Sequence, residues 1–559
     1  MKLLRFNISL LAFVAACAFA HIASAADTDR TYTGGWRTSD DVVTGWDWTL
    51  PPTVEPAAAS GLFTINNNAY PSGWPGAKIR VINATWRDLE PSPGNYDFSS
   101  IKNYLDDPNY DGIFLNVRGF VTSFPNQPQE VTAPSWATVA NGYPTYTTNG
   151  GVGAITSLVA FNANVKTKHL ALIAALKNSG ILTSPRLWGQ IIHMPGASRG
   201  EEFNTDQGNV TASTAVAIEY IQAWAAAAGT NAKRLMWTDD RGGTAEKATI
   251  NDAALAAGVG ARGGAIESWL WNQYTPGFKK YTLQTYNNGY LEVDETAQML
   301  VGNRAWHDQN EAAGVYDNPA NSLQQQNWRM ASLRTLQMRR NLIWVDASYR
   351  MNPEMSKWMS LEAGHAVTTS PDAWVCLMRT WTRSSNDGTG FADREIKNFE
   401  RWLYQRDVPG AMTTPVIAKN HGGNKSLVDA LSSSLSYVDV ARAGSAVGIA
   451  VDDRFIGASS GRIAIKVTFL DSNTGEWSLE YVKSNGAQGI RTVTSTGTDV
   501  VRTVTFFLDD FSAPAKGKTL DFKLVSPSGN TPFMFVRVIK LAAGGGNPVP
   551  LPPQDVVVE

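Results

Sequence analysis

The chain has 559 residues, of which 43% are hydrophobic and 18% charged, so it can bury a large core and is not intrinsically disordered. Its 48 Lys and Arg residues against 50 Asp and Glu residues give a formal charge of −2, with a pI near 6.4 and no block of basic residues. This balance excludes nucleic acid and anionic membrane surfaces as expected partners.

The first 25 residues have the pattern of a signal peptide. Lys2 and Arg5 form a positive end, residues 10–20 form an apolar core too short to span a bilayer, and residues 23–25 form a small-residue cleavage site. We therefore expect a secreted or periplasmic protein whose mature chain starts near residue 26. An alternative is that Cys17 ends a lipobox-like VAAC sequence and anchors an outer-membrane lipoprotein. No later segment is long and apolar enough to predict a transmembrane helix.

Short apolar runs alternate with helical patterns between about residues 75 and 405. Strands are predicted at residues 79–86, 112–118, 186–193, 233–238, 265–270, 290–293 and 342–345. Helices are predicted at residues 99–105, 160–177, 212–228 and 322–340. This order is typical of an α/β barrel or of a doubly wound sheet, and the absence of a G-x-G-x-x-G motif after any strand argues against dinucleotide binding. If residues 79–86 form the second strand, and the first lies upstream at 45–48 or 61–65, the predicted strands number eight, as a (β/α)8 barrel requires.

The pattern changes to a period of two beyond about residue 415. Alternating runs at 463–469, 477–481, 502–507 and 534–539 are separated by Gly, Asn, Asp and Ser, which is typical of antiparallel strands. We therefore expect an α/β fold in which a (β/α)8 TIM barrel at 26–415 is followed by an all-β, jelly-roll-like sandwich at 416–541. Residues 542–559 form a disordered tail rich in Pro and Gly. Cys376 lies in an apolar run and predicts a buried thiol.

Residues 86–98, WRDLEPSPGNYDF, are the most specific stretch of the chain. They resemble the second barrel strand of clan A glycoside hydrolases, notably the β-galactosidases, in which W-x-x-L-E-P-x-x-G-x-Y-D-F recurs. The resemblance implies a TIM barrel of the type secreted by polysaccharide-degrading bacteria. It also implies that this segment, including Glu90, is structural and shapes the floor of the sugar site.

The same resemblance implies two catalytic carboxylates. Clan A enzymes carry an acid/base Glu after the fourth strand and a nucleophilic Glu at the end of the seventh, which points to Glu201 or Glu202 as the acid and Glu295 as the nucleophile. Retaining hydrolysis needs such carboxyl groups about 5 Å apart. The chain lacks the Asn that precedes the acid in the clan, which leaves the choice between Glu201 and Glu202 open. Asp294 is the main alternative to Glu295.

Other side chains at predicted strand ends would line the same pocket, because barrel enzymes place their sites at the carboxyl ends of the strands. As candidate ligands of sugar hydroxyls the sequence offers Arg118, His193, Asp239, Asp240, Glu267 and Trp269, with Trp271 as an alternative stacking platform. Each of them could equally make an ordinary ion pair or core contact. The spacing of the six His residues predicts no metal site, and no cofactor is implied.

The C-terminal region carries a resemblance of its own. Residues 467–481, VTFLDSNTGEWSLEY, resemble the lectin-like sandwich appended to bacterial polysaccharide hydrolases. Whether this region binds glycan or calcium stays open. Trp477 alternates with Leu479, so it can face the core as easily as solvent, which favours a buttressing role.

These patterns together predict a secreted, retaining glycoside hydrolase that acts on a polysaccharide or its oligosaccharides, with galactose-containing glycans as the first guess. One alternative is a non-catalytic carbohydrate-binding protein on a barrel scaffold. Another is a serine esterase that uses Ser198, because residues 196–200 match the G-x-S-x-G elbow. The same pattern recurs at 457–461 within the β-rich region, where no elbow can form. The expected partner is a carbohydrate substrate, and the oligomeric state stays undetermined.

Overall fold

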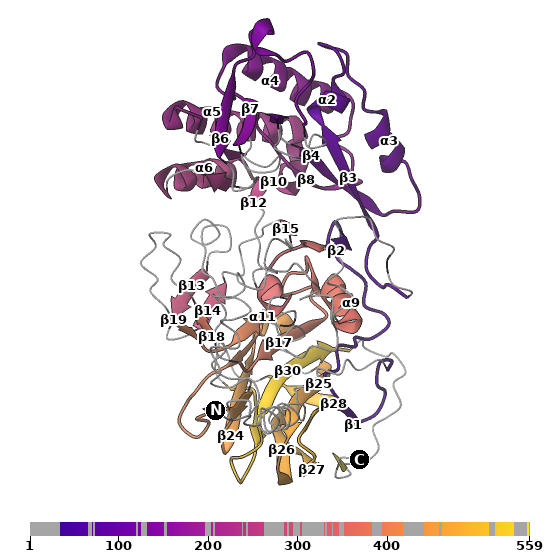
Figure 1. Ribbon diagram of the computed structural model, residues 1–559. Coiled ribbons are helices and arrows are strands. Elements are labelled where there is room, and N and C mark those ends of the chain that lie inside the picture. The colour runs from indigo at the N-terminus through magenta and orange to yellow at the C-terminus, as the bar shows by residue number, and fades with distance from the viewer. Residues whose placement is uncertain are drawn as a thin grey trace, which may run out of the picture.

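The described strands form two regions of different architecture, an α/β region and a large antiparallel sheet, which lie one above the other in Figure 1. The computed structural model describes residues 34–64, 70, 73–118, 121–123, 131–149, 154–195, 203–204, 207–237, 239–241, 244–261, 284–287, 290–293, 302–304, 329, 332–337, 339–345, 352–378, 380–382, 394–416, 441–457, 461–513, 520–541 and 556–557.

The α/β region is built on a five-stranded parallel sheet. Its order is β12-β10-β8-β4-β3, formed by β3 (Ile79–Thr85), β4 (Gly112–Arg118), β8 (Leu187–Ile191), β10 (Leu235–Trp237) and β12 (Gly260–Ala261). All four pairings are parallel, so the carboxyl ends of the strands meet at one edge. Every residue of β4 except its last is buried, as expected of a strand that is covered on both faces.

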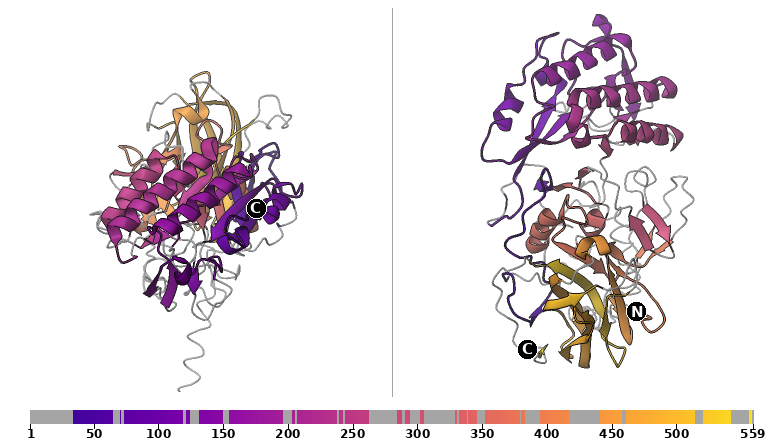
Figure 2. Two further views of the ribbon diagram at one scale, coloured as in Figure 1. Left: turned by 90° about the horizontal axis from the view of Figure 1, so that it is seen from above. Right: turned by 180° about the vertical axis from the view of Figure 1, so that it is seen from behind.

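Helices cover one face of this sheet. They are α2 (Trp86–Leu89), α3 (Ser99–Leu105), α4 (Ala163–Asn178), α5 (Val210–Ala228) and α6 (Thr244–Ala256), with the 3₁₀ helices η2 (Val139–Asn141) and η3 (Gly229–Arg234) between them. The helices α4 and α5 begin where the side chains of Asn162 and Asn209 accept hydrogen bonds from free backbone N–H groups of the first turn. Figure 2 shows the longer helices side by side when the molecule is seen from above. Their apolar side chains form one core with Ile82, Leu115 and Ile192 of the sheet side.

Smaller sheets complete this part of the chain. β2 (Gly61–Thr64), β16 (Leu342–Val345) and β15 (Gly302–Arg304) form a parallel three-stranded sheet. Antiparallel pairings join β5 (Val121–Ser123), β6 (Thr145–Asn149) and β7 (Ala154–Leu158), and also β13 (Gln284–Asn287) with β14 (Tyr290–Val293) and β18 (Thr380–Thr382) with β19 (Arg394–Ile396). A second cluster of apolar side chains, including Phe63, Phe114 and Leu342, lies between the three-stranded and five-stranded sheets.

The largest sheet has 14 strands. Its strands are β1 (Asp41–Thr44), β17 (Asp372–Cys376), β20 (Phe399–Arg401), β21 (Leu403–Gln405), β22 (Thr414–Val416), β23 (Ala441–Ala443), β24 (Ala446–Val451), β25 (Gly461–Asp471), β26 (Thr474–Lys483), β27 (Gln488–Thr496), β28 (Val500–Ser512), β29 (Phe522–Val525), β30 (Phe533–Lys540) and β31 (Val556–Val557). Their pairings are antiparallel except that of β27 with β31. Strands from both sides of residue 415 therefore share one sheet, accompanied by α9 (Pro353–Glu362) and α11 (Asp453–Ile456).

This sheet curls until its ends meet. Its path starts at β20 and ends at β21, and only Trp402 separates these two strands in the sequence. Side chains on alternate positions of β17 enter different cores: Val375 lies in the cluster that lines the inside of the curl, whereas Trp374 and Cys376 lie in the outer cluster with α9. The free thiol of Cys376 is buried, as predicted.

The predicted (β/α)8 barrel, and with it the resemblance to clan A glycoside hydrolases, is wrong. The dominant sheet is antiparallel and nearly closed, and the described parallel strands form two separate sheets of five and three strands. Within the described residues β2 pairs with β16 but makes no ladder with β3, so the parallel strands do not close. The predicted two-sheet sandwich is also wrong, because β1, β17, β20 and β21 join the C-terminal strands in a single sheet. An alternating order of strands and helices predicts that neighbouring strands pair in parallel. It does not determine whether those strands close into a barrel.

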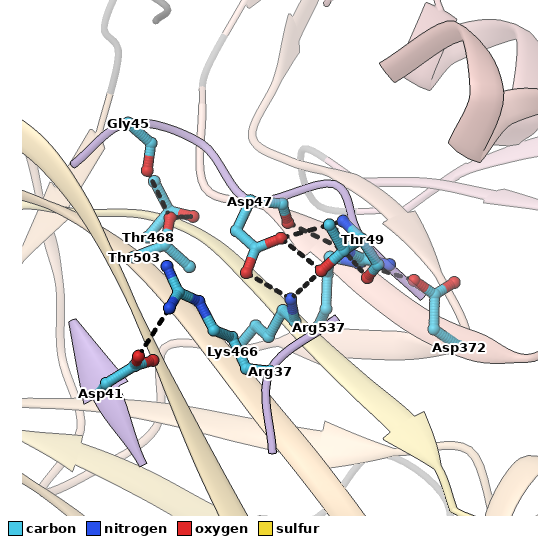
Figure 3. Close-up of polar contacts among 10 residues, drawn as sticks. All are labelled: Arg37, Asp41, Gly45, Asp47, Thr49, Asp372, Lys466, Thr468, Thr503 and Arg537. Carbon is cyan, nitrogen blue, oxygen red and sulfur yellow. Dashed lines mark hydrogen bonds and ion pairs between the residues drawn. The ribbon is translucent and has the colours of Figure 1, made fainter. Parts of the chain in front are cut away.

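A largely buried polar network ties the N-terminal segment to this sheet (Figure 3). The Nζ of Lys466 donates to Oδ2 of Asp47 at 2.5 Å and to the hydroxyl of Thr49 at 2.8 Å. Arg537 donates from Nε to Oδ2 of Asp372 at 2.6 Å and from Nη1 to the carbonyl of Asp47 at 2.9 Å. Burial lowers the pKa of Lys466 to about 8 although Asp47 opposes this shift, so the ammonium stays charged at pH 7. Burial raises the pKa of Asp47, but the attraction of Lys466 together with the hydrogen bonds from Lys466 and Thr49 holds the pKa of that carboxyl below its usual value.

Lys466→Met should lower the free energy of unfolding by about 3–5 kcal/mol, because it leaves the Asp47 carboxylate buried without its cation. Urea denaturation at pH 7 measures the loss. The double variant Asp47→Asn/Lys466→Met should recover part of it, since no unpaired charge remains. As a control, Lys166→Met removes the partly exposed pair of Lys166 with Glu219 and should cost less than about 1 kcal/mol. If Lys466→Met and Lys166→Met lower the free energy of unfolding equally, the buried pair of Lys466 with Asp47 stabilises the fold no more than an exposed pair does.

Candidate functional site

Polar side chains gather at the carboxyl edge of the five-stranded sheet. Asn83 is two residues from the end of β3, Asn116 is its direct partner on β4, and Arg118 is the last residue of β4. His193 follows β8 by two residues and is fully buried. Alternation along the strands places these side chains on the face opposite the helices. In parallel sheets this edge is where ligands bind.

The site has an apolar floor. Two positions before Asn83, Asn116 and His193, on the same face of each strand, lie the apolar residues Val81, Phe114 and Ile191. All three belong to the cluster between the two parallel sheets. The floor is nearly inaccessible to solvent, whereas Asn83 is exposed and Arg118 is half-buried. Phe63 and Leu342 of the three-stranded sheet pack against these side chains, so the floor is core, and Asn83 and Arg118 are the groups of the edge that reach solvent.

The two asparagines are hydrogen-bonded to each other across the strands. Nδ2 of Asn116 donates to Oδ1 of Asn83 at 3.0 Å. Asn116 is only 1% exposed, so its amide is fixed within the sheet, while Asn83 faces solvent. This hydrogen bond turns the carbonyl oxygen of Asn83 toward Asn116 and its amide nitrogen away from Asn116.

The loop that leaves β8 is held at both ends near this edge. Nε1 of Trp224 on α5 donates to the carbonyl of His193 at 3.2 Å, and Nε2 of Gln207 donates to the carbonyl of Pro195 at 3.2 Å. Beyond the loop, β9 (Phe203–Asn204) pairs in parallel with β11 (Asp239–Arg241), the segment that follows β10. The segments after β8 and after β10 are therefore tied together beyond the sheet edge.

The structure describes only some of the side chains that the sequence singled out for the site. Arg118 and His193 lie at the edge, on neighbouring strands. Asp239 and Asp240 belong to β11, but their side chains are outside the described part. The remaining candidates also lie outside the described residues: Glu201, Glu202, Glu267, Trp269 and Glu295, together with the alternatives Ser198, Trp271 and Asp294.

One step of the strand count is wrong. The strand at 290–293, expected to be the seventh parallel strand, is β14, and β14 forms an antiparallel hairpin with β13. Glu295 therefore follows a hairpin strand rather than the carboxyl end of a parallel one. The dipeptide Asn288-Gly289 between the two strands is the usual sequence signal of a hairpin, and the strand count overlooked it.

Asn83 and Asn116 are site residues that the sequence reading missed. Each interrupts an apolar strand two residues before its end, in IRVINAT and GIFLNVR. Asn is disfavoured in strands, so an Asn at the same position of two such runs was the available signal. Only the pairing register shows that the two are neighbours.

Glu90 is structural, as predicted. Its carboxylate accepts hydrogen bonds from Nε1 of Trp86 at 2.6 Å and from the backbone N–H of Gly94 at 2.7 Å, and the side chain is fully buried. Its carbonyl accepts from Nε1 of Trp136 at 2.9 Å. Both carboxylate oxygens thus hold the turn that follows α2, and neither is presented to solvent.

Aromatic side chains serve mainly as core. Nine tryptophans are less than about 2% exposed, which excludes them as open sugar platforms: Trp46, Trp48, Trp86, Trp224, Trp237, Trp358, Trp374, Trp402 and Trp477. Trp477 packs against Phe469 and Phe533 inside the curled sheet, with ring centroids 5.2 and 5.1 Å away. The strand around Trp477 therefore buttresses the fold at this position.

His169 on α4 lies behind the sheet among aromatic rings, with the Tyr220 ring 4.6 Å and the Trp86 ring 5.7 Å away. Complete burial lowers the pKa of His169 to about 3. It is therefore neutral at physiological pH and cannot act as a proton donor there. Within the part of the chain that the structure describes, no three His, Cys, Asp or Glu side chains are grouped to hold a metal ion. No helix in that same part has the length and hydropathy needed to cross a bilayer.

Comparison with known proteins adds no relative. The chain matches no protein-family model and no curated protein. Among solved structures it is similar to the PRD1 vertex protein P5, at 11% identity, over 31% of this chain and 98% of that one, with a TM-score of 0.14. A TM-score this low carries no argument about fold or function. The comparisons therefore assign the chain to no family, and the function has to be inferred from the site.

Proposed function

We propose that the protein is an exported glycoside hydrolase that binds its sugar at the carboxyl edge of the five-stranded sheet. The observation that supports this most is the meeting of Asn83, Asn116, Arg118 and His193 on one face, above an apolar floor. The exposed amide of Asn83 and the half-buried guanidinium of Arg118 are groups that pair with sugar hydroxyls, and the buried Asn116 and His193 lie beside them on neighbouring strands. Such a constellation also suits a polysaccharide chain, because the edge is open at Asn83.

The proposed chemistry is retaining hydrolysis by two carboxyl groups. One carboxylic acid donates a proton to the leaving oxygen while a carboxylate about 5 Å away attacks the anomeric carbon. Glu201 and Glu202 lie between Pro195 and β9 in the sequence, and Pro195 is hydrogen-bonded to Gln207 near the sheet edge. One of them is the proposed acid, and Glu295 is the proposed nucleophile.

Glu201→Gln and Glu202→Gln separate the proposed acid from its neighbour. The variant that removes the acid should lower kcat by about 10²–10⁴-fold, since proton donation to the leaving group is lost, and the other should change it little. Release of reducing ends from soluble galactan, xylan, mannan and β-glucan measures the effect. Added azide should partly restore the rate of the acid variant on an aryl glycoside with a good leaving group, which needs no proton.

Ser198→Ala is the matched control, since Ser198 is close to Glu201 and Glu202 in the sequence. It should leave glycan hydrolysis unchanged. If Ser198→Ala abolishes activity on p-nitrophenyl acetate and the glutamate variants do not, the protein is a serine esterase. Binding of a polysaccharide by the wild-type chain without release of reducing ends would make it a non-catalytic carbohydrate-binding protein.

A further inference from the structure

We infer that Asn83 is a sugar-binding residue that presents its amide N–H groups to a hydroxyl oxygen, and that Asn116 is the positioning residue that orients it. The inference rests on the proposed function. It states which partner donates the hydrogen bond between Asn83 and the sugar. It makes Asn83 a donor, so the sugar group opposite it must accept a hydrogen bond.

The geometry carries this assignment. Asn83 and Asn116 are direct neighbours on parallel strands, with their side chains on the same face. Asn116 is 1% exposed and donates to Oδ1 of Asn83 at 3.0 Å. Because this contact turns the Asn83 oxygen toward Asn116, it directs the two N–H groups of the Asn83 amide away from Asn116.

The exposure of Asn83 is unusual for its position. Ile79 and Val81, which precede it on the same face of β3, are both buried, whereas Ile82 and Ala84 face the helices. A β-branched or aromatic residue would stabilise a strand better there. The contact with Asn116 fixes one rotamer of Asn83 in advance, so little side-chain entropy is lost when a ligand binds.

Whether Asn83 donates to the sugar can be tested by substituting its hydrogen-bond partner Asn116 instead of Asn83 itself. In Asn116→Ala the Asn83 amide loses its orientation. In Asn116→Asp the carboxylate accepts a hydrogen bond, so Asn83 must turn its N–H groups inward and its oxygen toward the ligand. A merely structural cross-strand contact would be rescued by Asn116→Asp, because a hydrogen bond is restored. A positioning role would not be rescued, because the group offered to the sugar has the wrong polarity.

The experiment measures binding of the methyl β-glycosides of galactose, glucose, mannose and xylose to the full mature chain by ligand-observed NMR titration. Asn83→Ala, Asn116→Ala and Asn116→Asp should each weaken the glycoside that wild type binds by about 3–10-fold, as expected for one lost neutral hydrogen bond. The double variant Asn83→Ala/Asn116→Ala should bind no more weakly than Asn83→Ala, because Asn116 acts through Asn83. Thermal unfolding of each variant checks that the fold is kept.

Asn109→Ala is the matched control. Asn109 is an exposed asparagine hydrogen-bonded to Asp107, in the segment that enters β4 at the opposite edge of the sheet, and its loss should leave binding unchanged. If Asn83→Ala binds the glycoside as tightly as wild type, or if Asn116→Asp restores wild-type affinity, the inference is wrong but the proposed function still stands. Failure of the wild-type chain to bind any of the four glycosides, and to cleave any of the four polysaccharides, would instead overturn the proposed function on which it rests.

Discussion

Glu295→Gln should lower kcat on the preferred glycan by about 10⁴-fold while leaving substrate binding and the melting temperature nearly unchanged. Glutamine keeps the shape of the side chain but cannot attack the anomeric carbon, so no glycosyl-enzyme intermediate forms. The effect belongs to the chemical step, and therefore KM should not rise. Turnover of an aryl glycoside and of the polysaccharide, together with a binding titration, separates these quantities.

Asp294→Asn is the control for this prediction, because Asp294 is the neighbouring carboxylate and the main alternative nucleophile. It should reduce kcat by much less than Glu295→Gln. A large loss in Asp294→Asn with little change in Glu295→Gln would move the nucleophile by one residue and keep the mechanism. If neither variant changes turnover, retaining hydrolysis through this segment is refuted.

A chain that ends at residue 415 should fail to fold into a soluble, cooperatively unfolding protein. The truncation removes β28, β30 and β24, the strands that pair with β1, β17 and β21. It also removes Lys466 and Arg537, which leaves Asp47 and Asp372 without their cations in a core that excludes water. Each unpaired buried carboxylate costs several kcal/mol, against a total stability of about 5–15 kcal/mol.

Thermal unfolding and size-exclusion chromatography test the truncation. A chain that ends at residue 541 is the control, because among the described strands it loses only the two-residue β31. This control should melt within a few degrees of the full chain. If the chain ending at 415 unfolds cooperatively at the same temperature and keeps its activity on soluble oligosaccharides, the C-terminal strands are an independent targeting module.

The local elements were largely determined by the sequence itself. The apolar runs at 112–118 and 342–345 coincide with β4 and β16, and the pattern at 99–105 coincides with α3. Arg118 and His193 could be placed at the carboxyl edge from sequence, because each lies at or just after the end of an apolar run. Glu90 could be assigned a structural role from its motif. All of these inferences depend on residues that are close together in the chain.

Only the tertiary structure decided how these elements combine. β1 pairs with β28 although more than 450 residues separate them, and no local pattern encodes such a partner. β17 is buried throughout by the curled sheet and α9 and is apolar after Asp372, so its sequence resembles a parallel strand. Asn83 and Asn116 become a pair only through the register of β3 with β4. Periodicity reports which face of a strand is buried, whereas sheet order and closure depend on packing between distant segments, which no short stretch of sequence contains.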